Sequence, residues 1–249
     1  MTRAERIAGW LQEQAASAGA RGFVFGLSGG VDSAVVARLC HLAAPPHALG
    51  ALLPCYSHPD DEAHARQVAE TFGFPLVRVD LDNTYDALSA ALLDATKGLQ
   101  RQPGAIDIKQ QLPEANVKPR LRMAALYFIA NALNYLVAGT GNRSEITLGY
   151  YTKYGDGGVD LLPIGGLLKS EVRSLAAELG VPQAIIDRPP TAGLWMGQTD
   201  EDEMGFTYDA LERYLKDGAG AVDSATATRI DQLCRASDHK RVLPPIGPV

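Results

Sequence analysis

The six residues Ser28–Ser33, which read Ser-Gly-Gly-Val-Asp-Ser, combine residue types that hold phosphate groups. Two adjacent glycines let the main chain approach an anion without a Cβ in the way, and the serines supply hydroxyl donors. Asp32 would repel a phosphate unless a divalent metal ion lay between them. The segment therefore predicts a site for a nucleotide bound together with Mg²⁺.

The neighbouring residues place this segment between a strand and a helix. The apolar run 22–27 precedes it, and residues 34–39 follow it with the pattern of a helix start. Backbone N–H groups and the dipole of a helix N-terminus bind anions at such a junction. A P-loop is excluded because no Gly-Lys-Ser/Thr follows at the required spacing. The alternative is an ordinary strand-to-helix corner in which Asp32 only stabilises the first helical turn.

Composition is typical of a globular enzyme and disfavours a polyanion binder. The 249 residues are 46% hydrophobic and 21% charged, which suits one large α/β domain or two small ones. A net charge of −6 disfavours a nucleic-acid surface, because binding a polyanion depends on lysine and arginine displacing its counterions. We therefore expect no nucleic-acid partner, although a local basic pocket for a small anion is compatible with this charge.

The cysteines and the apolar runs bear on the compartment. Cys40, Cys55 and Cys234 are far apart and form no Cys-x-x-Cys pair, so neither a disulfide framework nor a zinc or iron–sulfur site is expected. No apolar run is long enough to cross a bilayer, and the first residues lack the pattern of a signal peptide. These features predict a cytoplasmic protein with buried free thiols and no membrane partner.

Strand and helix patterns alternate along the first half of the chain. Strand-like runs at 22–27, 48–53, 75–80 and 136–139 are separated by helical patterns at 60–72, 83–97 and 118–135, after a first amphipathic helix at 2–19. Such alternation predicts right-handed βαβ units and a parallel sheet. We expect an α/β fold, a doubly wound parallel sheet with helices on both faces, in a single domain of residues 1–249 with a small helical C-terminal subregion at about 200–249.

Three further segments carry structural expectations. The helix at 118–135 is apolar on nearly all sides, which predicts burial between the sheet and a second subunit. The polar stretch 100–114 is interpreted as an exposed loop. Residues 193–203 place Trp195 and Met196 beside an acidic cluster, which indicates either a lid over the site or a plain surface loop.

Six later segments, each weak alone, stand in a consistent order. They are Asn116–Met123, Gly139–Glu145, Gly149–Gly158, Leu162–Ile164 with Lys169, Arg188–Leu194 and His239–Arg241. Together with Ser28–Ser33, this series closely resembles the NAD synthetase family of the ATP-pyrophosphatase superfamily, and the fold it implies is adenine nucleotide alpha hydrolase-like. The resemblance implies the last step of NAD biosynthesis, in which ammonia and ATP convert deamido-NAD to NAD. The pyridine carboxylate attacks the α-phosphate of ATP, pyrophosphate leaves, and ammonia then displaces AMP from the adenylate.

The resemblance implies roles for particular residues. Asp32 and Glu145 match the family's Mg²⁺ ligands and Lys169 matches its ATP-binding lysine, so these three are the expected catalytic residues. The ATP contacts that it implies are Gly26, Leu27, Ser28, Gly29, Gly30, Val31, Asp32, Ser33, Thr140, Lys169 and Thr191. The deamido-NAD contacts that it implies are Arg120, Lys153, Asp160, His239 and Lys240.

The resemblance also bears on the nitrogen donor and on assembly. Relatives that use glutamine carry an additional N-terminal amidase domain, whereas only residues 1–21 precede the first strand here, so free ammonia is the expected donor. A homodimer built mostly on the helices at 83–98 and 118–136 is implied, with deamido-NAD near the interface. Some members read Thr-Asp-His-Ala-Ala-Glu where this chain has Thr140–Glu145, so contacts within residues 141–144 are not carried over.

Each of these residues has a plainer explanation when it is taken singly. Glu145 would also stabilise the first turn of a helix, and Lys169 would also serve as a solvated charge on a helix face. Among other functions, GMP synthetase shares the loop motif, and a catalytically silent sensor would bind ATP without releasing AMP. An RNA-modifying relative is disfavoured by the acidic net charge.

Overall fold

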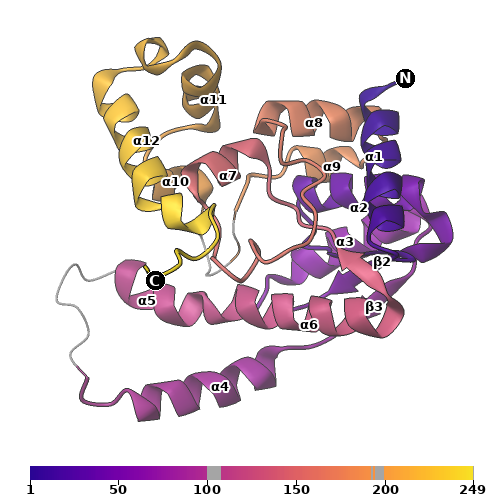
Figure 1. Ribbon diagram of the computed structural model, residues 1–249, viewed down its shortest axis with the longest axis horizontal. Coiled ribbons are helices and arrows are strands. Elements are labelled where there is room, and N and C mark those ends of the chain that lie inside the picture. Colours follow the sequence, from indigo (N-terminus) through magenta and orange to yellow (C-terminus); the bar gives the residue numbers. More distant parts are fainter. Residues whose placement is uncertain (100–107, 192, 194–198, 249) are drawn as a thin grey trace.

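Four parallel strands form the centre of the fold, in the spatial order β3-β2-β1-β4. The strands are β1 (Gly22–Gly26), β2 (Ala48–Leu52), β3 (Leu76–Arg78) and β4 (Tyr135–Val137). The computed structural model, drawn in Figure 1, describes residues 1–99, 108–191, 193 and 199–248. Since β1 connects to β2 on one side and pairs with β4 on the other, the strand order reverses between β1 and β4. Open α/β sheets bind ligands in the crevice beyond the carboxyl ends of such a strand pair.

Helices cover both faces of the sheet, which confirms the predicted doubly wound α/β fold. Phe23 and Phe25 point to the face covered by α1 (Arg3–Ser17), α2 (Val31–Ala43), α3 (Pro59–Phe72) and α8 (Lys169–Glu178). Val24 points to the opposite face, where α4 (Asp82–Ala95) and α6 (Val117–Leu133) pack. These three strand residues are fully buried. The run of consecutive apolar residues in β1 is thus explained by burial on both sides.

A smaller group of helices stands beside the sheet (Figure 1). It consists of α10 (Asp200–Met204), α11 (Tyr208–Asp217) and α12 (Ser224–Ala236), where the sequence predicts a helical C-terminal subregion. Met204, Leu211 and Ile230 form an apolar cluster with Leu148 of α7 (Arg143–Leu148). This cluster joins the C-terminal helices to α7, which begins just beyond the end of β4. A short helix, α9 (Gln183–Ile186), follows α8.

The prediction of an exposed loop at 100–114 is wrong for its second half. Residues Ile108–Ala115 form the helix α5, which leads directly into α6 with only Asn116 between them, and the Asn116 backbone N–H donates to the Leu112 carbonyl oxygen at 2.8 Å. Ala115 at its end is only 6% exposed. The polar glutamines and Pro113 indicate a loop, but glutamine has a favourable helix propensity, and this segment continues the backbone of α6 toward its N-terminus. Residues 100–107 lie outside the described part of the chain.

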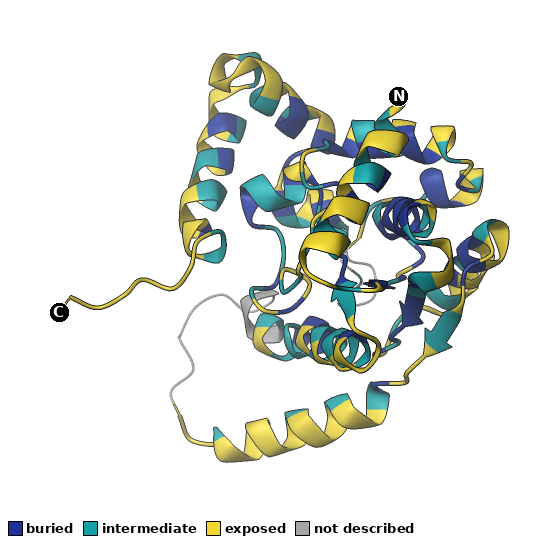
Figure 2. Ribbon diagram, turned by 45° about the vertical axis from the view of Figure 1, so that its right-hand side comes forward, coloured by how far each residue is buried: buried dark blue, intermediate teal, exposed yellow. Residues whose placement is uncertain are grey.

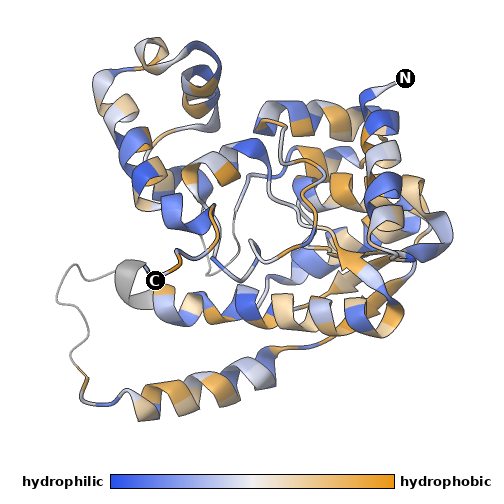
Figure 3. Cartoon of the chain, in the orientation of Figure 1, coloured by the Kyte–Doolittle hydropathy of each residue, from blue (hydrophilic) through white to orange (hydrophobic). Residues whose placement is uncertain are grey.

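Within one chain, α6 is covered on one side only. Its sheet-facing residues pack against Val24 and Val137, whereas Phe128 is 77% exposed. The neighbouring α4 has no buried residue, and its leucines at 88, 92 and 93 are 40–46% exposed. Figures 2 and 3 show this exposed and partly apolar surface of α4. A single chain thus leaves uncovered the surface that the sequence predicts to meet a second subunit.

Candidate active site

The Ser28–Ser33 segment forms a tight turn at the carboxyl end of β1 and leads into α2 at Val31. Its hydroxyl groups close the turn. Ser33 Oγ donates to the Gly30 carbonyl oxygen at 2.9 Å and accepts from the Ser28 backbone N–H at 3.2 Å. Gly30 is the N-cap of α2 and supplies no capping side chain. The first N–H groups of this 13-residue helix therefore point toward an anion site.

Gly29 is required because the turn is pressed against α3. Its φ is +77°, and a Cβ at this position would lie 2.5 Å from the Asp61 carbonyl oxygen. The Asp61 carboxylate binds Arg188, with 2.5 Å between Oδ1 and Nη2. The phosphate-binding turn, α3 and the segment that leads to Thr191 are thus held against one another.

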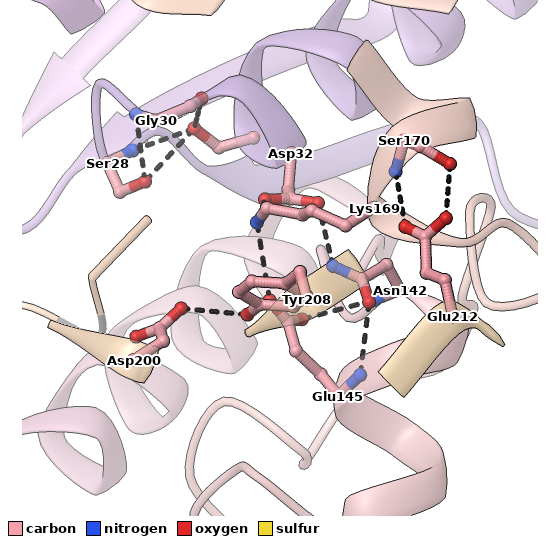
Figure 4. Close-up of polar contacts among 11 residues, drawn as sticks. Ser28, Gly30, Asp32, Asn142, Glu145, Lys169, Ser170, Asp200, Tyr208 and Glu212 are labelled. Carbon is pink, nitrogen blue, oxygen red and sulfur yellow. Dashed lines mark hydrogen bonds and ion pairs between the residues drawn. The ribbon is translucent and has the colours of Figure 1, made fainter. Parts of the chain in front are cut away.

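Lys169 lies between two carboxylates at the start of α8 (Figure 4). Its Nζ is 2.5 Å from Asp32 Oδ2 and 3.6 Å from Glu145 Oε1, and its side chain is 4% exposed. The three residues come from the first turns of α8, α2 and α7. All three line a cavity of about 1180 Å³. The fold therefore brings the predicted catalytic residues together at the expected edge of the sheet.

Burial and mutual charge set the electrostatics of this group. Burial, and after it the charge of Asp32, raises the pKa of Glu145 to about 8. Burial by itself would lower the pKa of Lys169, but the carboxylates of Asp32 and Glu145 outweigh this effect and raise that pKa above its usual value. Lys169 is thus a fixed cation. Because burial, and after it the charge of Asp32, raises the pKa of Glu145 despite the nearby lysine, a further cation beside the two carboxylates would stabilise the ionised form of Glu145.

The donor set fits a magnesium ion. Asp32 Oδ2 and Glu145 Oε1 both face Lys169 Nζ. Proteins usually bind Mg²⁺ through one or two carboxylates, with substrate phosphates and water completing the octahedron. In the part of the chain that the structure describes, no group of three or more His, Cys, Asp or Glu residues could hold a metal ion. The two carboxylates therefore suit a metal ion that is also held by a nucleotide.

Residues of the C-terminal helices contact Lys169 and its neighbour Ser170. Lys169 Nζ lies 5.3 Å from the centroid of the Tyr208 ring, and the Tyr208 hydroxyl donates to Asp200 Oδ2 at 2.8 Å. Glu212 of α11 accepts hydrogen bonds from the Ser170 backbone N–H at 2.7 Å and from the Ser170 hydroxyl. Sequence analysis missed Tyr208 and Glu212 because no motif marks them. Asp200 belongs to the acidic cluster of residues 193–203, for which the sequence predicts no catalytic role.

The remaining predicted ATP contacts reach the same cavity, with one exception. Gly29 faces α3 instead of the cavity. Arg122, which the sequence analysis did not single out for a role, also lines the cavity and donates to the Leu53 carbonyl oxygen at 3.0 Å. Of the segment 193–203, for which a lid or a plain surface loop is expected, residues 194–198 lie outside the described residues. The predicted contacts that line the cavity are Gly26, Leu27, Ser28, Gly30, Val31, Asp32, Ser33, Thr140, Lys169 and Thr191.

Four of the five predicted deamido-NAD contacts also line this cavity and lie close together. Arg120 Nη2 donates to the Lys153 carbonyl oxygen at 3.3 Å, and Lys153 Nζ donates to the His239 carbonyl oxygen. Lys240 Nζ donates to two carbonyl oxygens of the loop 149–151, at 2.6 Å each. Basic residues from α6, a loop and the C-terminal segment thus form a surface suited to an anionic ligand.

Asp160, the fifth predicted deamido-NAD contact, lies outside the residues that line the cavity. Its carboxylate accepts from the Tyr127 hydroxyl at 2.9 Å and from the Val137 backbone N–H at 2.8 Å. It is exposed beside α6 and does not line the cavity. Within one chain, Asp160 therefore does not join the other four, and its contact with deamido-NAD stays a prediction.

Comparison with known proteins agrees with this geometry. The model of the family described as NAD synthase matches residues 3–244, nearly the whole chain. The chain belongs to the NAD synthase family. The NH(3)-dependent NAD(+) synthetase of Carboxydothermus hydrogenoformans is 48% identical, over 98% of this chain and 96% of that relative. The resemblance inferred from the sequence is thereby confirmed.

Solved structures of related enzymes share the fold. The NMN synthetase from Francisella tularensis has a TM-score of 0.88 at 36% identity, covering 99% of this chain and 98% of that one. The NH3-dependent NAD synthetase from Campylobacter jejuni has a TM-score of 0.78 at 27% identity, covering 99% and 97%. Family membership argues against the GMP synthetase and RNA-modifying alternatives. The silent sensor is left to experiment.

Proposed function

We propose that this protein is a ligase that amidates deamido-NAD with ammonia, at the expense of ATP, to give NAD, AMP and pyrophosphate. One observation carries the proposal: the Asp32–Lys169–Glu145 group and the basic cluster around Arg120 and Lys240 line a single cavity. A nucleotide at the α2 N-terminus and an anionic dinucleotide on the basic cluster would meet there. The reaction needs this proximity, because a carboxylate must attack a polyphosphate of the same charge.

The chain's own groups offset that repulsion. The glycine turn and the first N–H groups of α2 hold the ATP phosphates, and Thr140 and Thr191 complete the nucleotide contacts. Lys169, held as a cation by its two carboxylates, neutralises charge that develops as pyrophosphate leaves. We propose Asp32 and Glu145 as the Mg²⁺ ligands. The ion, when bound, supplies Lewis-acid stabilisation of the phosphate oxygens.

Free ammonia is the proposed nitrogen donor. The relative from Carboxydothermus hydrogenoformans is named NH(3)-dependent, and the match covers 96% of that protein. The amine attacks the carbonyl carbon of the adenylated pyridine carboxylate, and AMP leaves with its phosphate oxygen. Ammonium must first lose a proton, because its nitrogen has no free lone pair.

We further propose a homodimer that forms on α4 and α6. The exposed leucines of α4 and Phe128 of α6 provide an apolar surface, and solvent-exposed apolar patches commonly mark protein interfaces. Asp160 supports this arrangement, because it lies on the α6 side of the chain and outside its own cavity. In the dimer, Asp160 would contact the deamido-NAD that the partner subunit binds.

The proposed location is the cytoplasm. The three cysteines are free, and Cys40 and Cys55 are buried. Free thiols are typical of a reducing compartment. Among the helices that the structure describes, none is both long enough and apolar enough to cross a bilayer.

The mononucleotide is a second candidate substrate. The Francisella tularensis structure is that of an NMN synthetase, and its TM-score of 0.88 exceeds the 0.78 of the Campylobacter jejuni NAD synthetase. The corresponding acid substrate would be nicotinic acid mononucleotide, which lacks the adenylate half of deamido-NAD. The volume of the cavity, about 1180 Å³, does not by itself discriminate between the two ligands.

Product analysis separates these possibilities. Purified protein is incubated with ATP, Mg²⁺ and an ammonium salt, with deamido-NAD in one series and nicotinic acid mononucleotide in the other. Equal amounts of NAD, AMP and pyrophosphate, formed only with ammonium and deamido-NAD, are expected. A higher kcat/KM with nicotinic acid mononucleotide than with deamido-NAD would identify the mononucleotide as the substrate instead. Nucleotide binding without AMP release in either series would establish the sensor instead.

A further inference from the structure

Asn142 lies between the two carboxylates that flank Lys169 (Figure 4). It is fully buried, with 0% of its surface exposed, and it is the N-cap of α7. Its Oδ1 accepts from the Glu145 backbone N–H at 3.0 Å, and its own backbone N–H donates to Glu145 Oε2 at 3.2 Å. Its Nδ2 donates to Asp32 Oδ1 at 3.0 Å. One side chain thus joins the loop after β4 to the turn after β1.

These bonds use one oxygen of each carboxylate. Asn142 occupies Asp32 Oδ1 and Glu145 Oε2. The remaining oxygens, Asp32 Oδ2 and Glu145 Oε1, are the two that face Lys169 Nζ at 2.5 and 3.6 Å. A carboxylate held by a hydrogen bond at one oxygen has a defined orientation for the other. Asn142 therefore determines which oxygen of each residue is presented to the cavity.

We propose that Asn142 is a positioning residue that holds Asp32 and Glu145 so that each presents a single oxygen to the metal ion of the ATP complex. The inference rests on the proposed function of this site. Mg²⁺ demands near-ideal octahedral geometry and uses few protein oxygens, so a fixed pair of single oxygens suits it. Hydrogen bonds to the ligating groups commonly affect metal affinity about 10–100-fold.

Capping and positioning require different groups of Asn142. A side-chain oxygen that accepts from the N3 backbone N–H suffices for the N-cap, and serine and aspartate supply it as well as asparagine does. Only the amide Nδ2 donates to Asp32, and a cap does not need that donor. Asn142→Ser therefore keeps the cap and removes the bond to Asp32, whereas Asn142→Ala removes both.

The test compares metal affinity with stability in the full chain. Mn²⁺ serves as the probe, and water proton relaxation measures its dissociation constant from the protein–ATP complex without deamido-NAD. We expect Asn142→Ser to weaken Mn²⁺ binding about 10-fold and to lower the thermal midpoint only by the effect of losing the buried bond to Asp32, because the cap is kept. Asn142→Ala should weaken Mn²⁺ binding to the same degree and lower the thermal midpoint further, because it also loses the cap. Asp223→Ser, at the N-cap of α12 and away from the site, is the matched control and should change neither quantity.

Either of two results would overturn the inference. Mn²⁺ affinity of Asn142→Ser equal to that of the wild-type protein would show that the bond to Asp32 is dispensable. Mn²⁺ affinity that falls in step with the thermal midpoint from wild type through Asn142→Ser to Asn142→Ala would assign Asn142 to capping alone. Because no deamido-NAD is present, the comparison holds even if the wild-type protein makes no NAD. Failure of the proposed function is thus seen separately, in the product analysis.

Discussion

Glu212 provides the most direct test of how the C-terminal helices serve the catalytic lysine. It is 6% exposed on α11 and accepts from both the backbone N–H and the hydroxyl of Ser170, the residue next to Lys169. Leu168, the N-cap of α8, has no side chain that can accept a hydrogen bond. A carboxylate from a distant helix therefore satisfies the first turn of α8. We predict that Glu212→Ala destabilises the protein and displaces Lys169.

The contacts of Glu212 determine how much stability the protein should lose. A hydrogen bond to a charged group contributes about 1.5–3 kcal/mol, and loss of the carboxylate leaves two Ser170 donors without this partner. The ion pair of Glu212 with Lys216 adds little, because the lysine is 50% exposed. We expect the free energy of unfolding to fall by about 3 kcal/mol, which lowers the thermal midpoint by roughly 6–12 °C for a chain of this size.

The assay combines thermal unfolding with steady-state kinetics. Glu212→Ala should also lower kcat about 10-fold, because Lys169 acts on the departing pyrophosphate and its backbone is no longer held in place. Glu212→Gln keeps one acceptor and one donor for Ser170 and should lose only about 1 kcal/mol. Lys216→Ala is the matched control and should stay within about 0.5 kcal/mol of wild type. Wild-type stability and kcat in Glu212→Ala would refute this account of α8.

Three further predictions concern the metal ligands, pH and assembly. Asp32→Asn should abolish most AMP release by weakening metal binding while the fold is retained; turnover equal to wild type at limiting Mg²⁺ would contradict this role. The pKa of Glu145 rises from 4.5 to about 8, so the folded state keeps a proton that the unfolded chain has lost. The protonated Glu145 carboxyl therefore contributes stability that is complete below about pH 4.5 and declines toward pH 8. Glutamine carries no such proton. In the absence of divalent ions, the thermal midpoint should therefore fall less between pH 6 and 8.5 in Glu145→Gln than in wild type. An equal fall in both proteins would argue against the raised pKa. Phe128→Asp should shift the protein from dimer to monomer in light scattering, and an unchanged mass would place the interface elsewhere.

Features that depend on local chemistry were predictable from the sequence. The glycine pair between an apolar run and a helix start predicts the anion site, because the turn, the helix dipole and the free N–H groups all arise within Ser28–Val36. The alternation of strands and helices predicts the parallel sheet, because a helix that crosses over between two strands returns the chain to the same end of the sheet. The sheet then carries Asp32 and Glu145 to one edge, since both follow parallel strands.

Other features depend on contacts between distant segments, and there the sequence misled or was silent. The helix at 108–115 was missed because its polar residues and Pro113 resemble a loop, whereas the segment continues into α6. The sequence did not indicate that the Asp160 carboxylate accepts hydrogen bonds from Tyr127 and from the β4 backbone. Asn142 stands in a segment where the family pattern varies, so resemblance could not assign its role.

The sequence by itself determined the chemistry of this protein: a phosphate-binding turn, two carboxylates and a lysine in the order of the NAD synthase family. Only the tertiary structure decided how these groups are held. Asn142 reaches Asp32 across 110 positions of the chain, and Glu212 reaches Ser170 across 42. Residue types and local spacing are properties of a few neighbouring positions, whereas a hydrogen bond between distant segments exists only after the chain has folded. The supporting contacts of the site therefore appear in the structure alone.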